Sequence, residues 1–154
     1  TFTPPIKFHF SMIFCSDESS LPDYIPKIFD VINQYKLCLL FGQMGSGKTS
    51  LVRALGKYLG CSKDIGSPSF SIINEYRYIN AEGQADQFYH MDLYRLERIE
   101  QALDIAIEEP LFSGHICIIE WPELIMPLIQ NEQRIEIYIE FLENQKRNYT
   151  LITK

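Results

Sequence analysis

The chain has 154 residues, of which 46% are hydrophobic and 22% are charged. This length suits one domain, here expected over residues 1–154, and it allows a full core without disulfides or structural metal. The formal net charge of −6 argues against strong nucleic-acid binding by the chain alone. Because no apolar run could span a bilayer and no secretory signal is visible, we expect a cytoplasmic protein that does not bind membranes.

The four cysteines, Cys15, Cys38, Cys61 and Cys117, lie far apart in the sequence and form no C-x-x-C pair. Cys38 and Cys117 lie within apolar runs that have the composition of strands. We therefore expect buried free thiols in a reducing compartment, and neither disulfides nor a zinc site.

The N-terminal part of the chain predicts a strand followed by a helix. Apolar residues alternate over residues 7–14, which predicts the strand, and the polar residues 16–20 predict a loop. Residues 21–32 carry apolar side chains at three- and four-residue spacing, which predicts the helix. Because proline is tolerated only in the first turn of a helix, Asp23 as the N-cap would accommodate Pro26.

A short apolar run at residues 36–41 predicts the next strand, and it leads into a sequence of the form G-x-x-x-x-G-K-T. Apolar residues then recur at helical spacing from Leu51, and Gly60 is the expected C-cap. Strand, loop and helix in this order aim the helix N-terminus at an anion. The predicted nucleotide-binding residues are Gly42, Gln43, Met44, Gly45, Ser46, Gly47, Lys48, Thr49 and Ser50.

Each residue type in this loop suits phosphate binding. Glycine has no Cβ, so the loop can direct several backbone N–H groups at one phosphate. Lys48 adds a mobile positive charge for the β- and γ-phosphate oxygens, and the Thr49 hydroxyl is a hard oxygen ligand that suits Mg²⁺.

Two further strands are expected after the polar connection at residues 61–69. Residues 70–78 and 87–91 are rich in β-forming residues, and the polar turn at residues 80–84 between them predicts a β-hairpin. The apolar spacing of Leu96, Ile99, Leu103 and Ile107 then predicts a short helix.

The C-terminal third predicts one buried strand and a closing antiparallel pair. Residues 115–119 are almost continuously apolar, which is typical of a strand covered on both faces in a parallel sheet. A short helix with Leu124, Ile125 and Leu128 follows, and residues 134–141 and 148–153 alternate as two paired strands.

Two acidic residues follow predicted strands. Asp92 ends the strand at residues 87–91, and Glu120 follows four apolar residues in the Walker-B pattern. In P-loop folds the carboxyl ends of neighbouring strands lie beside the loop. We therefore predict that Asp92 and Glu120, with Thr49, hold Mg²⁺ or orient the attacking water. The alternatives are a solvated strand end for Glu120 and a turn-forming role for Asp92.

Other candidates have both a functional and a structural interpretation. Ser67 or Ser69 could supply an oxygen in a switch loop that senses the γ-phosphate, or could belong to a simple serine–proline turn. Trp121 could pack against the site, face a partner or fill the core. His90 lies next to the predicted site, although a strand histidine is more often structural.

Three motifs appear in order behind the P-loop. They are Ser67-Pro68-Ser69-Phe70, His90-Met91-Asp92-Leu93-Tyr94-Arg95-Leu96 and Glu120-Trp121-Pro122-Glu123. Over residues 20–142 the chain resembles the TsaE (YjeE) family, the bacterial ATPase that works in forming N6-threonylcarbamoyladenosine on tRNA. The resemblance implies a three-layer α/β P-loop NTPase domain with parallel central strands and added antiparallel strands. It also implies ATP hydrolysis with Mg²⁺.

The resemblance assigns roles to individual residues. The loop lysine and threonine of the family match Lys48 and Thr49, its motif aspartate matches Asp92, and its E-W-P-E glutamate and tryptophan match Glu120 and Trp121. By this correspondence Lys48, Asp92 and Glu120 are the expected catalytic residues. Thr49, Asp92 and Glu120 are the expected Mg²⁺ site.

The chain departs from the family pattern at several positions. Gln43 stands where members often carry an acid, and Ser69 stands where they usually carry threonine. The segment after Leu103 lacks a glycine that is often present, and Pro110 is unusual there. These departures bear on local geometry more than on the family assignment.

The partners that the resemblance implies are a threonylcarbamoyl transferase subunit and its non-catalytic paralogue. By this resemblance, the transferase makes the modification and the ATPase resets the complex between turnovers. We expect tRNA to be held mainly by the partners, which agrees with the acidity of this chain. We also expect slow hydrolysis by the isolated chain, because a partner can complete such a site.

Two other functions are compatible with a P-loop. A small-molecule or nucleoside kinase usually carries an arginine-rich lid, whereas the 14 Lys and Arg residues here do not cluster after the P-loop helix. The other is a nucleotide-dependent binding module without useful turnover, which would be favoured if Lys48→Ala and Glu120→Ala both preserved function in cells and no ATP were hydrolysed with the partners present.

Overall fold

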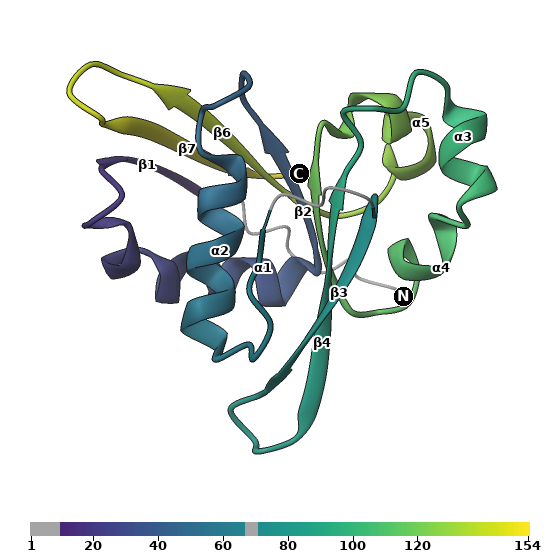
Figure 1. Ribbon diagram of the computed structural model, residues 1–154, viewed down its shortest axis with the longest axis horizontal. Helices are drawn as coiled ribbons and strands as arrows, with labels where there is room; N and C mark the ends of the chain where they lie inside the picture. The colour runs from purple at the N-terminus through teal and green to yellow at the C-terminus, as the bar shows by residue number, and fades with distance from the viewer. Residues whose placement is uncertain (1–9, 67–70) are drawn as a thin grey trace, which may run out of the picture.

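The computed structural model describes residues 10–66 and 71–154, which form a seven-stranded sheet with helices on both faces (Figure 1). The strands are β1 (Ser11–Ser16), β2 (Leu37–Phe41), β3 (Ile73–Ile79), β4 (Ala85–Asp92), β5 (Ile116–Glu120), β6 (Ile135–Phe141) and β7 (Arg147–Thr153). The helices are η1 (Leu21–Asp23), α1 (Ile25–Tyr35), α2 (Lys48–Leu59), α3 (Ile99–Asp104), α4 (Glu108–Leu111), η2 (Pro122–Ile125) and α5 (Met126–Ile129).

The strand order is β1-β7-β6-β2-β5-β4-β3. The four central strands β6, β2, β5 and β4 are parallel, whereas β3, β7 and β1 are added in antiparallel pairs at the two edges. The predicted α/β fold class, with parallel central strands and antiparallel additions, is confirmed. The hairpin of β3 and β4 and the closing pair of β6 and β7 are confirmed as well.

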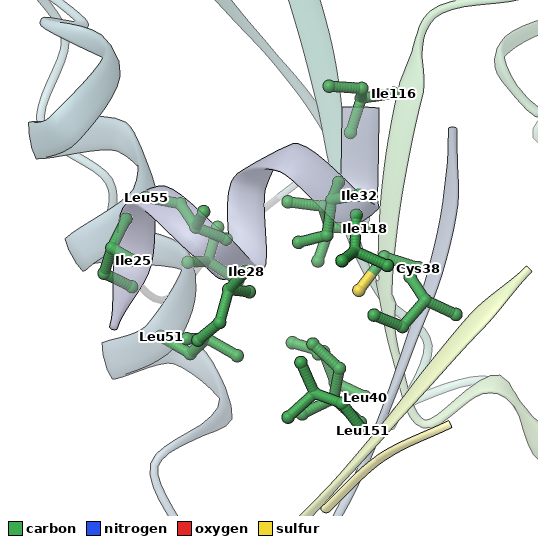
Figure 2. Close-up of a cluster of buried hydrophobic side chains, with 14 of the residues drawn as sticks. Ile25, Ile28, Ile32, Cys38, Leu40, Leu51, Leu55, Ile116, Ile118 and Leu151 are labelled. Atoms are coloured by element: carbon green, nitrogen blue, oxygen red, sulfur yellow. The ribbon is translucent and has the colours of Figure 1, made fainter. Parts of the chain in front are cut away.

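Both faces of the central strands are buried, and the side chains divide between two cores. Cys38 and Leu40 of β2 face the helices α1 and α2, whereas Leu37 and Leu39 face α3, η2 and α5. The first core is shown in Figure 2, where the labelled members are Ile25, Ile28, Ile32, Cys38, Leu40, Leu51, Leu55, Ile116, Ile118 and Leu151. Each fully buried aliphatic side chain contributes about 1.5–3 kcal/mol, so double-sided burial explains the continuous apolar run in β5.

The start of α1 differs from the sequence prediction. Tyr24 is the N-cap of the helix, and Asp23 ends the preceding turn η1, so the prediction of Asp23 as N-cap was wrong. Tyr24 N–H donates to the carbonyl of Leu21 at 3.0 Å, and Leu21 itself is buried. Anchoring of this turn in the core therefore delays the helix by one residue, and Pro26 still falls in the first turn, where it removes no helical hydrogen bond.

Two predicted thiols are buried in the sheet. Cys38 and Cys117 are buried, and desolvation raises the pKa of Cys117 to about 12 and also raises the pKa of Cys38. Thiols that remain protonated at neutral pH are poor nucleophiles, so these side chains act as small apolar groups.

In the described ranges, no helix combines the length and apolarity that a membrane crossing requires.

A strained residue lies in the segment that follows Leu103. Ala106 has a φ of 56°, in the left-handed region, and its N–H donates to the Leu103 carbonyl at 2.9 Å. Glycine adopts this conformation without a steric clash, whereas alanine does not. The segment that lacks the glycine noted above is therefore a segment where the backbone would accommodate one.

Replacing Ala106 with glycine is expected to raise the free energy of unfolding by about 0.5–1 kcal/mol. The left-handed conformation costs alanine about 1–2 kcal/mol, and the larger unfolded-state entropy of glycine offsets about 0.5–1 kcal/mol of the relief. Urea denaturation measures the change. Ala102→Gly, a buried helical position, is the control and should lose about 1 kcal/mol or more. Equal destabilisation by both variants would contradict the assignment of strain to Ala106.

Candidate functional site

The predicted phosphate loop connects the C-terminal end of β2, where Phe41 is partly buried, to the first turn of α2. Gly45 and Gly47 have φ angles of 78° and 107°, which only glycine adopts readily, and Gly47 is the N-cap of α2. A side chain on Gly42 would lie 2.7 Å from the carbonyl oxygen of Ile139, so this position also requires glycine. The loop is therefore shaped by its glycines, and α2 presents its free N–H groups at the loop.

Lys48 lies inside the loop and is only 5% exposed. Its Nζ donates to the carbonyl oxygens of Gly42 at 2.5 Å and Gln43 at 2.9 Å. Burial lowers the pKa of the Lys48 ammonium, and the nearby carboxylates, chiefly Glu120 and then Asp92, oppose that shift. An ammonium held by neutral carbonyls can turn to an incoming phosphate, which is a stronger acceptor because it is charged.

Glu120 lies at the end of β5 and is 3% exposed. Thr49 Oγ1 donates to Glu120 Oε1 at 2.9 Å, which joins the first turn of α2 to the strand end. His90 Nε2, fully buried on β4, lies 2.9 Å from the same oxygen, so a protonated Nε2 donates to the carboxylate. Two contacts to one oxygen fix the carboxylate, and they leave Oε2 as the oxygen available to a water or an ion.

Asp92 lies beside Glu120, because these two residues pair directly across β4 and β5. Asp92 Oδ1 accepts a hydrogen bond from the Tyr94 N–H at 3.1 Å, which is the turn-forming contact that the sequence left open as an alternative. Asp92 also lines the cavity at the loop, so its turn contact and its place at the site are compatible.

One cavity of about 380 Å³ gathers most of the predicted site. Its lining residues are Met44, Gly45, Gly47, Lys48, Thr49, Ser50, Asp92, Tyr94, Glu120, Trp121 and Arg147. Of the predicted loop residues, Gly42, Gln43 and Ser46 line a neighbouring cavity of about 500 Å³ together with Ile139, Glu140 and Phe141. The predicted switch residues Ser67 and Ser69 lie outside the described residues.

Trp121 packs against the site rather than in the deep core. Its φ and ψ are both 55°, a left-handed conformation that is uncommon for a bulky residue. The indole ring lies 4.2 Å from Lys48 Nζ and 5.0 Å from the Tyr94 ring. The strained backbone therefore turns the indole towards the lysine, where its π face stabilises the ammonium.

The oxygen donors of this site have the chemistry that would suit Mg²⁺. Thr49, Asp92 and Glu120 offer hard oxygen atoms, and Mg²⁺ sites commonly use one or two carboxylates with water and substrate phosphates. In the part of the chain that the structure describes, no group of three or more His, Cys, Asp or Glu could hold a metal ion. The oxygen set beside a helix N-terminus thus suits a metal–phosphate ligand.

One lining residue, Arg147, was not predicted. Tyr94, which also lines the cavity, belongs to the H-x-D-L-Y-R-L motif that marks this part of the site in the sequence. Arg147 begins β7, far from every motif, and its polar surroundings in the sequence gave no signal. Only the pairing of β7 with β6, and of β6 with β2, brings Arg147 to the loop.

Comparison with known proteins gives consistent matches. A family model described as "Threonylcarbamoyl adenosine biosynthesis protein TsaE" matches residues 15–149. Proteins named tRNA threonylcarbamoyladenosine biosynthesis protein TsaE are similar to this chain in Rickettsia conorii (37% identity over 76% of this chain and 63% of that protein) and Synechocystis (42% over 60% and 57%). The chain therefore spans less than two thirds of the length of these two relatives.

A third relative and one solved structure align over more of their length. The TsaE of Rickettsia bellii is 30% identical over 89% of this chain and 91% of that protein. The crystal structure of Bacillus subtilis YdiB superposes with a TM-score of 0.65 over 94% of this chain and 86% of that chain, at 22% identity. The structural match supports the fold alone.

Proposed function

The chain belongs to the TsaE family, and we propose that it is a Mg²⁺-dependent cytoplasmic ATPase of tRNA threonylcarbamoyladenosine biosynthesis. The observation that carries the proposal is the convergence of Lys48, Thr49, Asp92 and Glu120 on one cavity at the N-terminus of α2. Two neighbouring carboxylates beside a phosphate loop are more than nucleotide retention needs, because they would repel a triphosphate without a metal ion between them.

In this proposal, the loop and three side chains would bind the phosphates, the metal ion and the attacking water. Backbone N–H groups of the loop would hold the phosphates, and Lys48 would turn from the Gly42 and Gln43 carbonyls to the β and γ oxygens. Thr49 would exchange its hydrogen bond to Glu120 for a metal contact. Glu120, held through one oxygen by His90, would orient the attacking water through the other.

Mg²⁺, when bound, would neutralise charge on the β- and γ-phosphate oxygens. Asp92 lies on the strand next to Glu120, so it would hold the metal ion directly or through water. Trp121 would cover Lys48 and exclude water from one side of its ammonium. A drier site strengthens the attraction between the ammonium and the phosphates.

The proposed partners are a threonylcarbamoyl transferase subunit and its non-catalytic paralogue, with tRNA bound through that complex. The relatives carry the name of this biosynthetic process. In this proposal the chain converts ATP hydrolysis into a conformational cycle of the transferase. It does not act on the adenosine itself, and its net charge of −6 suits indirect contact with tRNA.

The test is ATP hydrolysis by the full chain, measured alone and with both partner proteins and tRNA. We expect slow turnover alone and at least about tenfold faster turnover with the partners, because a partner group can complete a P-loop site. Omission of Mg²⁺ should abolish turnover. A lack of hydrolysis in the complete mixture would contradict the proposal, and a phosphorylated small-molecule acceptor would support the kinase alternative.

A further inference from the structure

Arg147 lies against the phosphate loop, although it belongs to no nucleotide-binding motif. A Cβ on Gly47 would lie 2.6 Å from Arg147 Nε and 3.1 Å from its Cζ, so the guanidinium covers the α-carbon of the N-cap glycine of α2. Arg147 also lines the same cavity as Lys48 and Thr49. Its side chain therefore lies beside the phosphate loop, at the edge of the cavity that Lys48 and Thr49 line.

The charge of Arg147 has no carboxylate partner within ion-pair distance among the described residues. Arg77 and Arg134, by contrast, pair with Glu75 and Glu136 at 3.1 Å and 2.9 Å. The Nε of Arg147 is buried and has no hydrogen-bond partner in the described ranges. A buried donor on a charged group costs free energy when it has no acceptor, and a phosphate bound at the adjacent loop would offset that cost through its attraction to the guanidinium charge.

The guanidinium is also held in position by aromatic neighbours. Its Cζ lies 5.7 Å from the ring of Phe141, the last residue of β6. Its charge also acts on Tyr149, where burial raises the pKa of the phenol and Arg147 opposes the rise. A planar cation placed in advance loses little entropy when it binds phosphate oxygens through two N–H groups.

The strand order sets which end of a nucleotide Arg147 would meet. The acids lie on β5 and β4, on one side of β2, whereas Arg147 lies on β7, beyond β6 on the other side. A metal ion held by these acids would serve the β- and γ-phosphate end of a nucleotide. Arg147 would therefore face the opposite end of the phosphate chain, towards the α-phosphate and the nucleoside.

We propose that Arg147 is a nucleotide-binding residue that donates to the phosphates nearest the nucleoside. The proposal rests on the function proposed above, because it assumes that the cavity takes a nucleoside di- or triphosphate. Together with Lys48 it supplies a second cation against the charge of the phosphates and the two carboxylates. The contact is made by ADP and ATP alike, so it contributes to affinity and not to the hydrolytic step.

The test compares nucleotide affinity and turnover among variants of the full chain. Arg147→Ala should weaken ADP and ATP by a similar factor, about ten- to a hundredfold, which is typical of a lost hydrogen bond to a charged group. The nucleotide affinity of Arg147→Lys should lie between that of Arg147→Ala and that of the unmodified chain, because lysine keeps the charge but loses the planar arrangement of N–H donors. Turnover at saturating ATP should stay close to that of the unmodified chain. Arg77→Ala, at an exposed arginine on β3, is the matched control and should bind like the unmodified chain.

Calorimetric titration gives the affinities, and thermal unfolding without nucleotide shows that each variant is folded. If the alanine variant does not fold, Arg147→Gln, which keeps the length and polarity of the side chain, takes its place. An ADP affinity of Arg147→Ala equal to that of the unmodified chain would overturn the proposal. A variant that keeps its ADP affinity but loses turnover would also overturn it, because Arg147 would then act in the hydrolytic step. If the unmodified chain binds neither nucleotide, the proposed function fails as well, which distinguishes that outcome from a failure of Arg147 alone.

Discussion

Replacing Glu120 with glutamine is expected to lower ATP turnover by about a hundredfold or more while ATP affinity changes little. The substitution keeps the shape of the side chain but removes the charge that would orient and polarise the attacking water. Glu120 is fixed by Thr49 and His90 at 2.9 Å each, and among the described residues no second carboxylate makes these two contacts. Turnover is measured with the partner proteins present, and affinity by titration with ATP and Mg²⁺.

Glu123 offers a matched control in the same motif. It is exposed and does not line the cavity, so Glu123→Gln should keep turnover close to that of the unmodified chain.

Asp92→Asn should also lose hydrolysis more than binding, because Asp92 pairs with Glu120 across the two strands. Unchanged turnover in either the Glu120 or the Asp92 variant would remove that residue from the mechanism.

Replacing Lys48 with alanine is expected to weaken ATP binding by about ten- to a hundredfold or more. Lys48 is the first residue of α2 and its ammonium lies at the loop, and a lost charge-assisted hydrogen bond costs about 1.5–3 kcal/mol. The substitution also removes the partner of the Trp121 ring, which lies 4.2 Å from Nζ. Calorimetric titration with ATP and Mg²⁺ measures the loss.

Lys57 provides the control for the loss of one positive charge. It lies in the last turn of α2, far along the helix from the loop, so Lys57→Ala should not change ATP affinity beyond a small factor. Equal affinities for the Lys48 variant and the unmodified chain would mean that the loop amides alone hold the nucleotide. Lys48 would then be a structural residue that ties the carbonyls of Gly42 and Gln43.

The sequence by itself determined the features that depend on neighbouring residues. The glycine spacing of residues 42–49 specifies the loop, since left-handed φ angles at Gly45 and Gly47 are a local requirement. The alternation of apolar residues specifies β3 with β4 and β6 with β7, since short turns join each pair. Asp92 and Glu120 could be recognised because each ends an apolar strand.

Only the tertiary structure decided how these pieces meet. Thr49 is 71 residues from Glu120 in the sequence, and His90 is 30 residues from it. In the fold, both side chains contact the same carboxylate oxygen, Oε1 of Glu120. Arg147 reaches Gly47 only because β6 pairs with β2 and carries β7 with it. The spacing of apolar residues in the sequence indicates which side chains are buried. It does not indicate which strand lies beside them, because burial of apolar surface is non-directional and any apolar face can pack on another. Strand order and register are set by packing of the whole sheet, and they placed the acids on one side of the loop and the arginine on the other.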